Sequence, residues 1–183
     1  MVLHFQEKGR INPVAAGDRM MADAYGMALD HLVITCVDLV LTYQNRVLLT
    51  QRQRPPRASW WLIGGRMMAG EAPTEAALRK ASEEANLQDL TADRLRYVGA
   101  YSTCFATRHQ PPQHHGLHSL NLTYQLELTE AEQGAIVLIP EEYSDWRWVE
   151  VTQVAAILAE DVSSDAAIDQ ALLRVIQDLD HLF

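Results

Sequence analysis

Two neighbouring carboxylates, Glu83 and Glu84, follow two basic residues, Arg79 and Lys80, in the stretch from residue 73 to residue 85. If this stretch is a helix, residues three and four positions apart share a face, so all four side chains line one side of it. Two carboxylates on one helix face can hold a hard divalent cation such as Mg²⁺, which takes oxygen ligands and shares its shell with substrate phosphates. The alternative is a solvated helix face with two ordinary ion pairs, each worth only about 0.3–0.5 kcal/mol.

A helix over residues 73–85 is the element that would position these side chains. Pro73 favours the first turn of a helix, and Asn86 can adopt the left-handed conformation that ends one. The opposite side of the helix carries small and apolar residues that allow close packing on a sheet: Ala77, Leu78, Ala81 and Ala85. Gly64 and Gly65 precede the helix, and because they lack side chains, a backbone carbonyl of either could be a further metal ligand.

The order of the other elements predicts an α+β fold, an α/β/α sandwich with a mixed β-sheet. Residues 32–43 and 47–53 read as strands, and the Gln44-Asn45 pair between them predicts a tight turn. Further strands are predicted at residues 60–63, 95–102, 117–128 and 145–149, and further helices at residues 18–30, 152–159 and 165–179. We therefore expect an N-terminal extension with a short helix over residues 1–30 and one domain over residues 31–183.

The bulk composition narrows the range of partners. The net charge of −9 and the pI of about 5.1 argue against nucleic-acid binding through bulk electrostatics, so any phosphate recognition must be local. Two cysteines, Cys36 and Cys104, favour a reducing compartment over a disulfide framework. The N-terminus has no secretory signal, and the longest apolar run is broken by Asp38 and too short to span a bilayer. These features predict a cytoplasmic protein whose partners include neither nucleic acid nor a membrane.

The frame from Gly65 to Leu87 resembles the Nudix box, which has glycine, glutamate, an Arg-Glu pair, two adjacent glutamates and glycine at fixed spacings. The positions that match are Gly65, Glu71, Arg79, Ala81, Glu83, Glu84 and Leu87. Two positions depart, because Lys80 stands where the family has glutamate and Asn86 where it has glycine. In many Nudix enzymes that glutamate is a metal ligand or the catalytic base. We predict that Lys80 pairs with Glu84 and fills the space of a further cation, so that the site holds one Mg²⁺ at most.

Most of residues 30–160 also resemble one branch of that family, the GDP-mannose mannosyl hydrolases. The resemblance rests on the runs VLLTQRQRPPRASWWLIGGR, LHSLNLTYQLEL and EEYSDWRWVEV. This branch also lacks glutamate at the Lys80 position, and it implies one Mg²⁺, displacement of GDP at the sugar carbon and a contact of His118 with the diphosphate. The branch takes its general base from a histidine in a late loop, but residues 159–167 contain none. Asp161 and a histidine of the 104–118 loop are the alternatives for that role.

Polar residues outside the box are candidates for contacts to the rest of the substrate. By resemblance, Arg52 and Arg66 are phosphate ligands, since arginine can bind phosphate through two parallel hydrogen bonds. For Arg54 and Arg57, a phosphate contact and a solvated loop position stay equally open. Asp38 interrupts an apolar strand, so it either faces a cleft and binds a sugar or a base, or faces outward.

We therefore expect a Nudix-type hydrolase that uses Mg²⁺, or Mn²⁺ in its place, and acts on a nucleoside diphosphate linked to another moiety, such as the nucleotide sugar GDP-mannose. The expected catalytic residues are Arg79, which orients the carboxylates by pairing with Glu71 or Glu83, Glu84 and His118. The expected substrate contacts are Asp38, Arg52, Arg54 and Arg66, and the expected metal ligands are Gly64, Gly65, Glu83 and Glu84. The alternatives are a sensor domain that binds a nucleotide or sugar without hydrolysis, and a protein-interaction scaffold. The resemblance also implies a homodimer.

Overall fold

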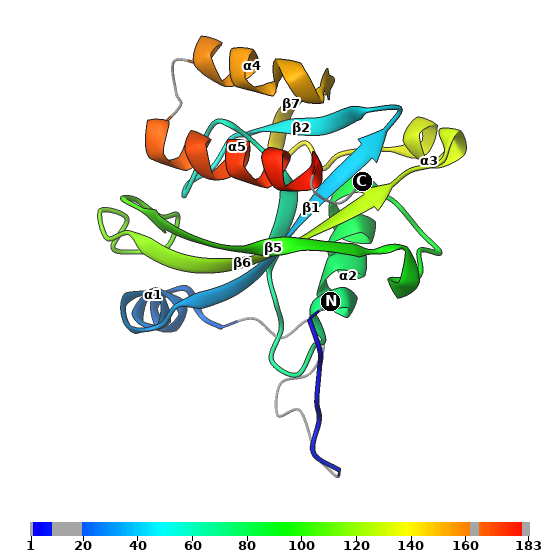
Figure 1. Ribbon diagram of the computed structural model, residues 1–183. Coiled ribbons are helices and arrows are strands. Elements are labelled where there is room, and N and C mark those ends of the chain that lie inside the picture. Colours follow the sequence, from blue (N-terminus) through cyan, green and yellow to red (C-terminus); the bar gives the residue numbers. More distant parts are fainter. Residues whose placement is uncertain (1, 9–19, 162–164, 181–183) are drawn as a thin grey trace.

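A mixed β-sheet lies at the centre of the structure, with helices on both of its faces (Figure 1). The computed structural model describes residues 2–8, 20–161 and 165–180. The strands are β1 (Ile34–Tyr43), β2 (Arg46–Arg52), β3 (Trp60–Trp61), β4 (Ile63–Arg66), β5 (Arg96–Phe105), β6 (Leu117–Glu127) and β7 (Tyr143–Glu150). The helices are α1 (Ala22–His31), α2 (Pro73–Ala85), α3 (Glu130–Ala135), α4 (Val154–Glu160) and α5 (Ala166–Asp180), with short 3₁₀ helices η1 (Ala92–Arg94) and η2 (Val151–Gln153).

Strand β1 organises the sheet. It pairs in parallel with β6 and antiparallel with β4, and its last two residues pair with β2 across a turn. β2 continues away to pair with β3 and β7, while β5 pairs with the far side of β6. The turn residues Gln44 and Asn45 have φ angles of 49° and 60°, the left-handed values that a two-residue hairpin turn requires. The predicted turn is therefore confirmed.

Side chains that alternate along β1 divide the core between the two faces of the sheet. Val37 and Leu39 belong to the cluster that packs against α2, whereas Val40 belongs to the cluster that packs against α4 and α5. Helix α5 contributes the apolar face that its sequence predicts, which is Ile168, Leu172, Val175, Ile176 and Leu179. The predicted α+β fold, a mixed sheet between helical layers, is confirmed.

Several element boundaries differ from the sequence prediction. The single strand expected at residues 60–63 is two strands, because the chain turns at Leu62 from pairing with β2 to pairing with β1. Helix α3 was not predicted, although Thr129 accepts a hydrogen bond from the Glu132 backbone N–H at 3.3 Å in a helix-capping arrangement. The first residues of the helix expected at 152–159 form η2. Positions 18 and 19 of the helix expected at 18–30 lie outside the described residues.

Helix α1 belongs to the segment expected to be an N-terminal extension, yet it contacts the rest of the molecule. Leu29 is buried, and Asp30 forms an ion pair with Arg108 at 2.6 Å. The division between residues 30 and 31 stays a prediction. No helix within the described ranges is long and apolar enough to cross a membrane.

Candidate functional site

The carboxylates of helix α2 face β4, because the small residues on the other side of the helix allow it to lie close to the sheet. Ala77 and Ala81 are fully buried, so the helix backbone lies close to the sheet. The backbone N–H of Gly64 on β4 donates to Glu84 Oε2 at 3.1 Å. A side chain at Gly64 has no room, since a Cβ there would lie 2.2 Å from the Val37 carbonyl oxygen. The hydrogen bond to Glu84 therefore depends on this close approach of β1, β4 and α2.

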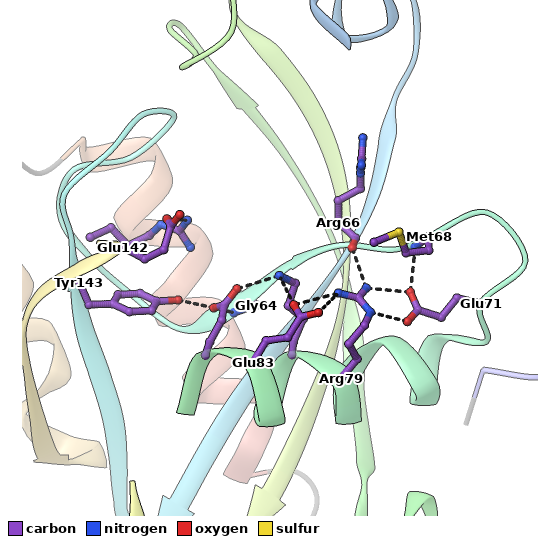
Figure 2. A network of polar contacts seen from close by, with 11 residues as sticks. Gly64, Arg66, Met68, Glu71, Arg79, Glu83, Glu142 and Tyr143 are labelled. Atoms are coloured by element: carbon purple, nitrogen blue, oxygen red, sulfur yellow. Dashed lines mark hydrogen bonds and ion pairs between the residues drawn. The ribbon is translucent and has the colours of Figure 1, made fainter. Parts of the chain in front are cut away.

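Arg79 ties the loop before α2 to the helix itself (Figure 2). Its guanidinium donates to both oxygens of Glu71, at 2.6 and 2.8 Å, and to the Arg66 carbonyl at 3.1 Å. A further bond of 3.1 Å joins it to Glu83. The hydrogen bond to Glu71 raises the pKa of Arg79, and the Met68 N–H donates to Glu71 Oε2 at 2.8 Å. Arg79 thus pairs with both carboxylates that the sequence offered as alternatives.

Glu84 is buried and has a donor on each oxygen. Its Oε2 accepts from the Gly64 N–H and from the Tyr143 hydroxyl, and its Oε1 accepts from the Lys80 ammonium at 3.0 Å. Only 8% of the Glu84 side chain is exposed. Burial, followed by the charge of Glu84, raises the pKa of Tyr143, so this phenol stays a hydrogen-bond donor at neutral pH.

Lys80 reaches both carboxylates of the pair. Its ammonium lies 3.0 Å from Glu84 Oε1 and 3.1 Å from Glu83 Oε2. Burial acts to raise the pKa of Glu83, but Lys80 and Arg79 together hold it below its ordinary value. The lysine stem runs beside Gly65, where a Cβ would lie 3.0 Å from Lys80 Cε. The predicted pairing of Lys80 with Glu84 is confirmed, and the structure adds Glu83 as a second partner.

The expected metal ligands do not fit a divalent ion in this arrangement. The inward oxygens of Glu83 and Glu84 are already bridged by an ammonium, and Gly64 contributes its N–H to the network. Across the described residues, no group of three or more His, Cys, Asp or Glu side chains could hold a metal ion. A divalent ion bound between these two carboxylates would have to displace Lys80.

A cleft in two parts lies over this network. The outer cleft, of about 510 Å³, is lined by Tyr25, Arg52, Arg66, Lys80, Glu83 and Glu142 among others. The inner recess, of about 280 Å³, is lined by Leu29, Asp38, Arg54, Trp61, Phe105 and Asn121 among others. Tyr25, Arg52 and Arg66 line both parts, so they mark the place where the two meet. Charged side chains line both parts of the cleft, and the inner recess adds the aromatic rings of Trp61 and Phe105.

Arg52, Arg54, Arg57 and Arg66 all line this cleft, and Arg57 is the most buried of them. The Arg66 guanidinium stacks on the Tyr25 ring at 4.4 Å, and its side chain extends away from α2 (Figure 2). Arg52 lies over the Tyr143 ring at 5.7 Å and 3.6 Å from Glu142. Arg54 is exposed at the rim of the inner recess. The structure therefore brings the three arginines expected to contact the substrate to one cleft.

Arg57 is different. It is 6% exposed, forms an ion pair with Asp169 of α5 and donates to the Trp60 carbonyl at 3.2 Å. Its guanidinium also lies 4.8 Å from the Trp61 ring centre. Arg57 is therefore not a solvated loop residue: it lines the inner recess and also fastens the 53–59 loop to α5, and its contact with phosphate stays a prediction.

A family model of the NUDIX domain matches residues 32–171. The chain belongs to the NUDIX domain family. An RNA pyrophosphohydrolase of Cereibacter sphaeroides strain KD131 is 29% identical over 133 residues, which cover 67% of this chain and 79% of that protein. The RNA pyrophosphohydrolase of strain ATCC 17029 shows the same identity and coverage. These relatives are not nucleotide-sugar hydrolases by name, so the resemblance to the GDP-mannose branch stays a prediction.

Solved structures support the NUDIX fold. A MutT NUDIX hydrolase from Burkholderia pseudomallei is 17% identical, with a TM-score of 0.59 over 81% of this chain and 99% of that chain. The NUDIX domain of Shewanella oneidensis NrtR, solved with ADP ribose, is 19% identical, with a TM-score of 0.56 over 89% and 99%. A C. elegans Ap4A hydrolase is 21% identical, with a TM-score of 0.55 over 82% and 100%. At these identities the likeness shows the fold alone.

Asp38 lies in the inner recess of this NUDIX domain. It is 6% exposed, and burial raises its pKa to about 7 against the opposing effects of Arg52 and a hydrogen bond from Trp61. Of the two positions that the sequence left open, the structure selects the one that faces the cleft. A carboxyl group that titrates near neutral pH can act either as a hydrogen-bond donor or as an acceptor toward a ligand.

The structure does not bring His118 to the cleft. Its neighbours Leu117 and Ser119 line the inner recess, and alternation along β6 turns His118 to the opposite face of the sheet. There its Nε2 lies 2.7 Å from Ser102 Oγ. The expected contact of His118 with a diphosphate is thus not supported by its position, because the register of β6 decides the direction of its side chain. His109, from the 106–116 loop, lines both parts of the cleft instead.

Sequence analysis assigned no role to Tyr25, Glu142 or Tyr143, which all belong to this site. Tyr25 lies on α1, forty residues before Gly65 in the chain, and reaches both parts of the cleft. Glu142 and Tyr143 come from the start of β7. Glu142 and Tyr143 lie in the run EEYSDWRWVEV, but only the pairing of β7 with β2 and the packing of α1 place these three residues beside the box.

Proposed function

We propose that this NUDIX domain binds and hydrolyses a nucleoside diphosphate linked to another moiety. The observation that carries the proposal is the pair of arginines, Arg52 and Arg66, at the junction of a charged outer cleft and a partly aromatic inner recess. A diphosphate at this junction would meet two guanidinium groups, which bind phosphate oxygens strongly. The recess beside it offers Trp61 and Phe105 for contact with a ring, and Asp38 and Asn121 for hydrogen bonds.

The related proteins support this substrate class. RNA pyrophosphohydrolase and Ap4A hydrolase are named for compounds in which nucleosides carry linked phosphates, and the NrtR domain was solved with ADP ribose. A nucleotide sugar such as GDP-mannose is the substrate favoured by the resemblance of residues 47–66, 117–128 and 141–151. The homodimer and the cytoplasmic location are proposals of the same kind, which rest on resemblance and on the composition of the sequence.

In this proposal the chain's own residues stabilise the leaving group and accept the proton. Arg52, Arg66 and Lys80 are cations along the outer cleft, so charge that develops on a leaving phosphate is stabilised electrostatically. His109 lines both parts of the cleft, and a histidine can accept a proton from an attacking water. No step is assigned to a divalent ion, because Lys80 bridges the carboxylates that would hold it.

The test is a hydrolysis assay with purified, folded protein. GDP-mannose, ADP ribose, Ap4A and a 5′-triphosphorylated RNA oligonucleotide are incubated separately, with Mg²⁺ and with a chelator, and products are separated by anion-exchange chromatography. We expect release of a nucleoside mono- or diphosphate from one of the small compounds, or of phosphate or pyrophosphate from the RNA. If none of them is turned over under either condition, the hydrolase proposal is wrong.

The second candidate is a domain that binds the same class of ligand without hydrolysing it. The specific observation in its favour is the bridge from Lys80 to Glu83 and Glu84, which stands in place of the metal that hydrolysis in this family was expected to need. The two candidates separate in one experiment. A compound that raises the melting temperature of the protein but yields no product identifies a binding domain.

A further inference from the structure

We propose that the Lys80 ammonium is the resident cation of this site and contacts the ligand's diphosphate in place of a divalent metal ion. The inference rests on the proposed ligand class and makes it more specific, since it concerns how the same site holds phosphate. Its basis is the position of Lys80 Nζ, which lies 3.0 Å from Glu84 Oε1 and 3.1 Å from Glu83 Oε2.

The surrounding groups hold both carboxylates around this nitrogen. Arg79 approaches Glu83 from the other side at 3.1 Å, and the Gly64 N–H and Tyr143 hydroxyl occupy the second oxygen of Glu84. A divalent ion would have to move the lysine away from these oxygens and would bring two positive charges beside Arg79. The network therefore favours the ammonium over a metal ion.

Burial keeps the ammonium in this position. The Lys80 side chain is 17% exposed and the Glu84 side chain 8% exposed, so solvent and salt screen their attraction only in part. Removal of Lys80 would leave the Glu84 carboxylate short of a partner in a buried place, which is costly. The stem of Lys80 lies against Gly65, where there is no space for a Cβ without a shift of the lysine. The positive charge of Lys80 is thus held beside Glu83 and Glu84.

The ammonium also has capacity for a ligand. A lysine ammonium has three N–H donors. Within the described part of the chain, the ion pairs of Lys80 direct these donors to two acceptors, Glu83 and Glu84. Lys80 lines the outer cleft together with Arg52 and Arg66. A phosphate oxygen in the outer cleft can therefore take the third donor, with the arginines on the neighbouring oxygens. Binding of this kind needs no metal.

The first test measures Mn²⁺ binding by electron paramagnetic resonance, without nucleotide. We expect no saturable binding to the unaltered protein, and saturable binding to Lys80→Glu, which replaces the ammonium with a third carboxylate. Lys80→Met is the matched variant that removes the charge without adding a ligand, and it should bind Mn²⁺ more weakly than Lys80→Glu. Stoichiometric Mn²⁺ binding to the unaltered protein, or none to a folded Lys80→Glu, overturns the inference.

The second test measures GDP affinity by calorimetry in a chelator and in Mg²⁺. We expect the two dissociation constants of the unaltered protein to agree within about twofold, and Lys80→Met to bind about tenfold more weakly or worse, as for the loss of a charged hydrogen bond. GDP binding that disappears in the chelator overturns the inference. If GDP binds in neither condition, the proposed ligand class fails for GDP, and the Mn²⁺ measurement alone decides the role of Lys80.

The chain offers an internal control for a third readout. Lys8 and Lys80 are its two lysines, and Lys8 is exposed. Acetylation followed by mass spectrometry should modify Lys8 at the same rate with and without GDP, whereas GDP in a chelator should slow the modification of Lys80 several-fold. An unchanged Lys80 rate in the presence of bound GDP contradicts a direct contact.

Discussion

Arg66 is the single residue on which the proposed ligand site depends most. Its guanidinium stacks on Tyr25 and faces both parts of the cleft, and no ion pair joins it to a carboxylate within the described part of the chain. Arg66→Ala should weaken GDP binding about tenfold to a hundredfold, because hydrogen bonds to charged groups are worth about 1.5–3 kcal/mol. Calorimetric titration with GDP measures the change.

Arg46→Ala is the matched control for this variant. Arg46 begins β2 and, like Arg66, lies over a tyrosine ring, but that ring is Tyr43 at 5.8 Å, away from the cleft. Its removal should leave the GDP dissociation constant unchanged. Equal affinities of the Arg66→Ala and Arg46→Ala proteins would exclude a role of Arg66 in ligand binding.

Substitution of two buried tyrosines compares what the site network contributes to stability with what the core contributes. Tyr143 donates to the Glu84 carboxylate, so Tyr143→Phe should lower the free energy of unfolding by about 1.5–3 kcal/mol. The Tyr124 hydroxyl is buried with no hydrogen-bond partner among the described residues, so Tyr124→Phe should lower it little or raise it. Urea denaturation monitored by circular dichroism measures both. Equal losses in the two variants would mean that the bond to Glu84 contributes nothing.

At the scale of elements, the Asp30 carboxylate joins α1 to the 106–116 loop, on which Gly26 also packs closely. Asp30 accepts from Arg108 at 2.6 Å and lies 3.0 Å from His115 Nδ1, while Arg108 also donates to carbonyls of its own loop. The hydrogen bond from Arg108, then that from His115, lowers the pKa of Asp30 from 3.8 to about 2. Because α1 carries Tyr25 into the cleft, this contact also completes the site.

A pKa that is lower in the folded state than in the unfolded state contributes stability above the unfolded value, and this contribution is lost as pH falls. For Asp30 the loss should occur from about pH 4 down to about pH 2. We therefore expect the hydrogen-exchange protection of α1 amides to fall in this window while that of α2 amides persists. Asp30→Asn should reduce the protection of α1 at neutral pH.

Asp23→Asn is the control, since Asp23 is an exposed residue of the same helix. It should leave the protection of α1 unchanged. If the amides of α1 keep their protection at pH 2, or if the two variants behave alike, Asp30 does not hold the helix in place.

At the scale of the whole molecule, one sheet separates two hydrophobic clusters and forms part of both. Leu126 is fully buried on the α2 side, and Leu172 is fully buried on the α5 side. Each truncation to alanine should lower the free energy of unfolding by about 2–5 kcal/mol. Because both clusters share β1 and β2, we expect each variant to unfold in a single transition.

Fluorescence and circular dichroism test this cooperativity together. With Trp146 and Trp148 replaced by phenylalanine, the fluorescence of Trp60 and Trp61 reports on the α5 side of the sheet, whereas circular dichroism reports on all helices and strands. Coincident urea transitions in both variants would support one cooperative unit. A Leu172→Ala protein whose fluorescence changes before its circular dichroism would show that the α4 and α5 layer unfolds on its own.

The local features of this protein were determined by its sequence. The limits of α2, the left-handed Gln44-Asn45 turn, the apolar face of α5 and the pairing of Lys80 with Glu84 all follow from the nearest few residues. Helix periodicity, strand alternation and the conformational preference of asparagine act over one turn or one pair of residues, so the sequence carries them directly. The spacing of the box residues, which marks the family, belongs to the same local level.

Tertiary structure alone decided which distant residues complete the site. Arg57 is buried against its ion-pair partner Asp169, which lies 112 positions away in the sequence. Glu84 accepts a hydrogen bond from the hydroxyl of Tyr143, 59 positions away. His118 faces away from the cleft because of the register of β6, and Tyr25 enters it because α1 packs where it does. Burial and strand register depend on contacts between segments that lie far apart in the chain, so the residues next to a position in the sequence do not predict them.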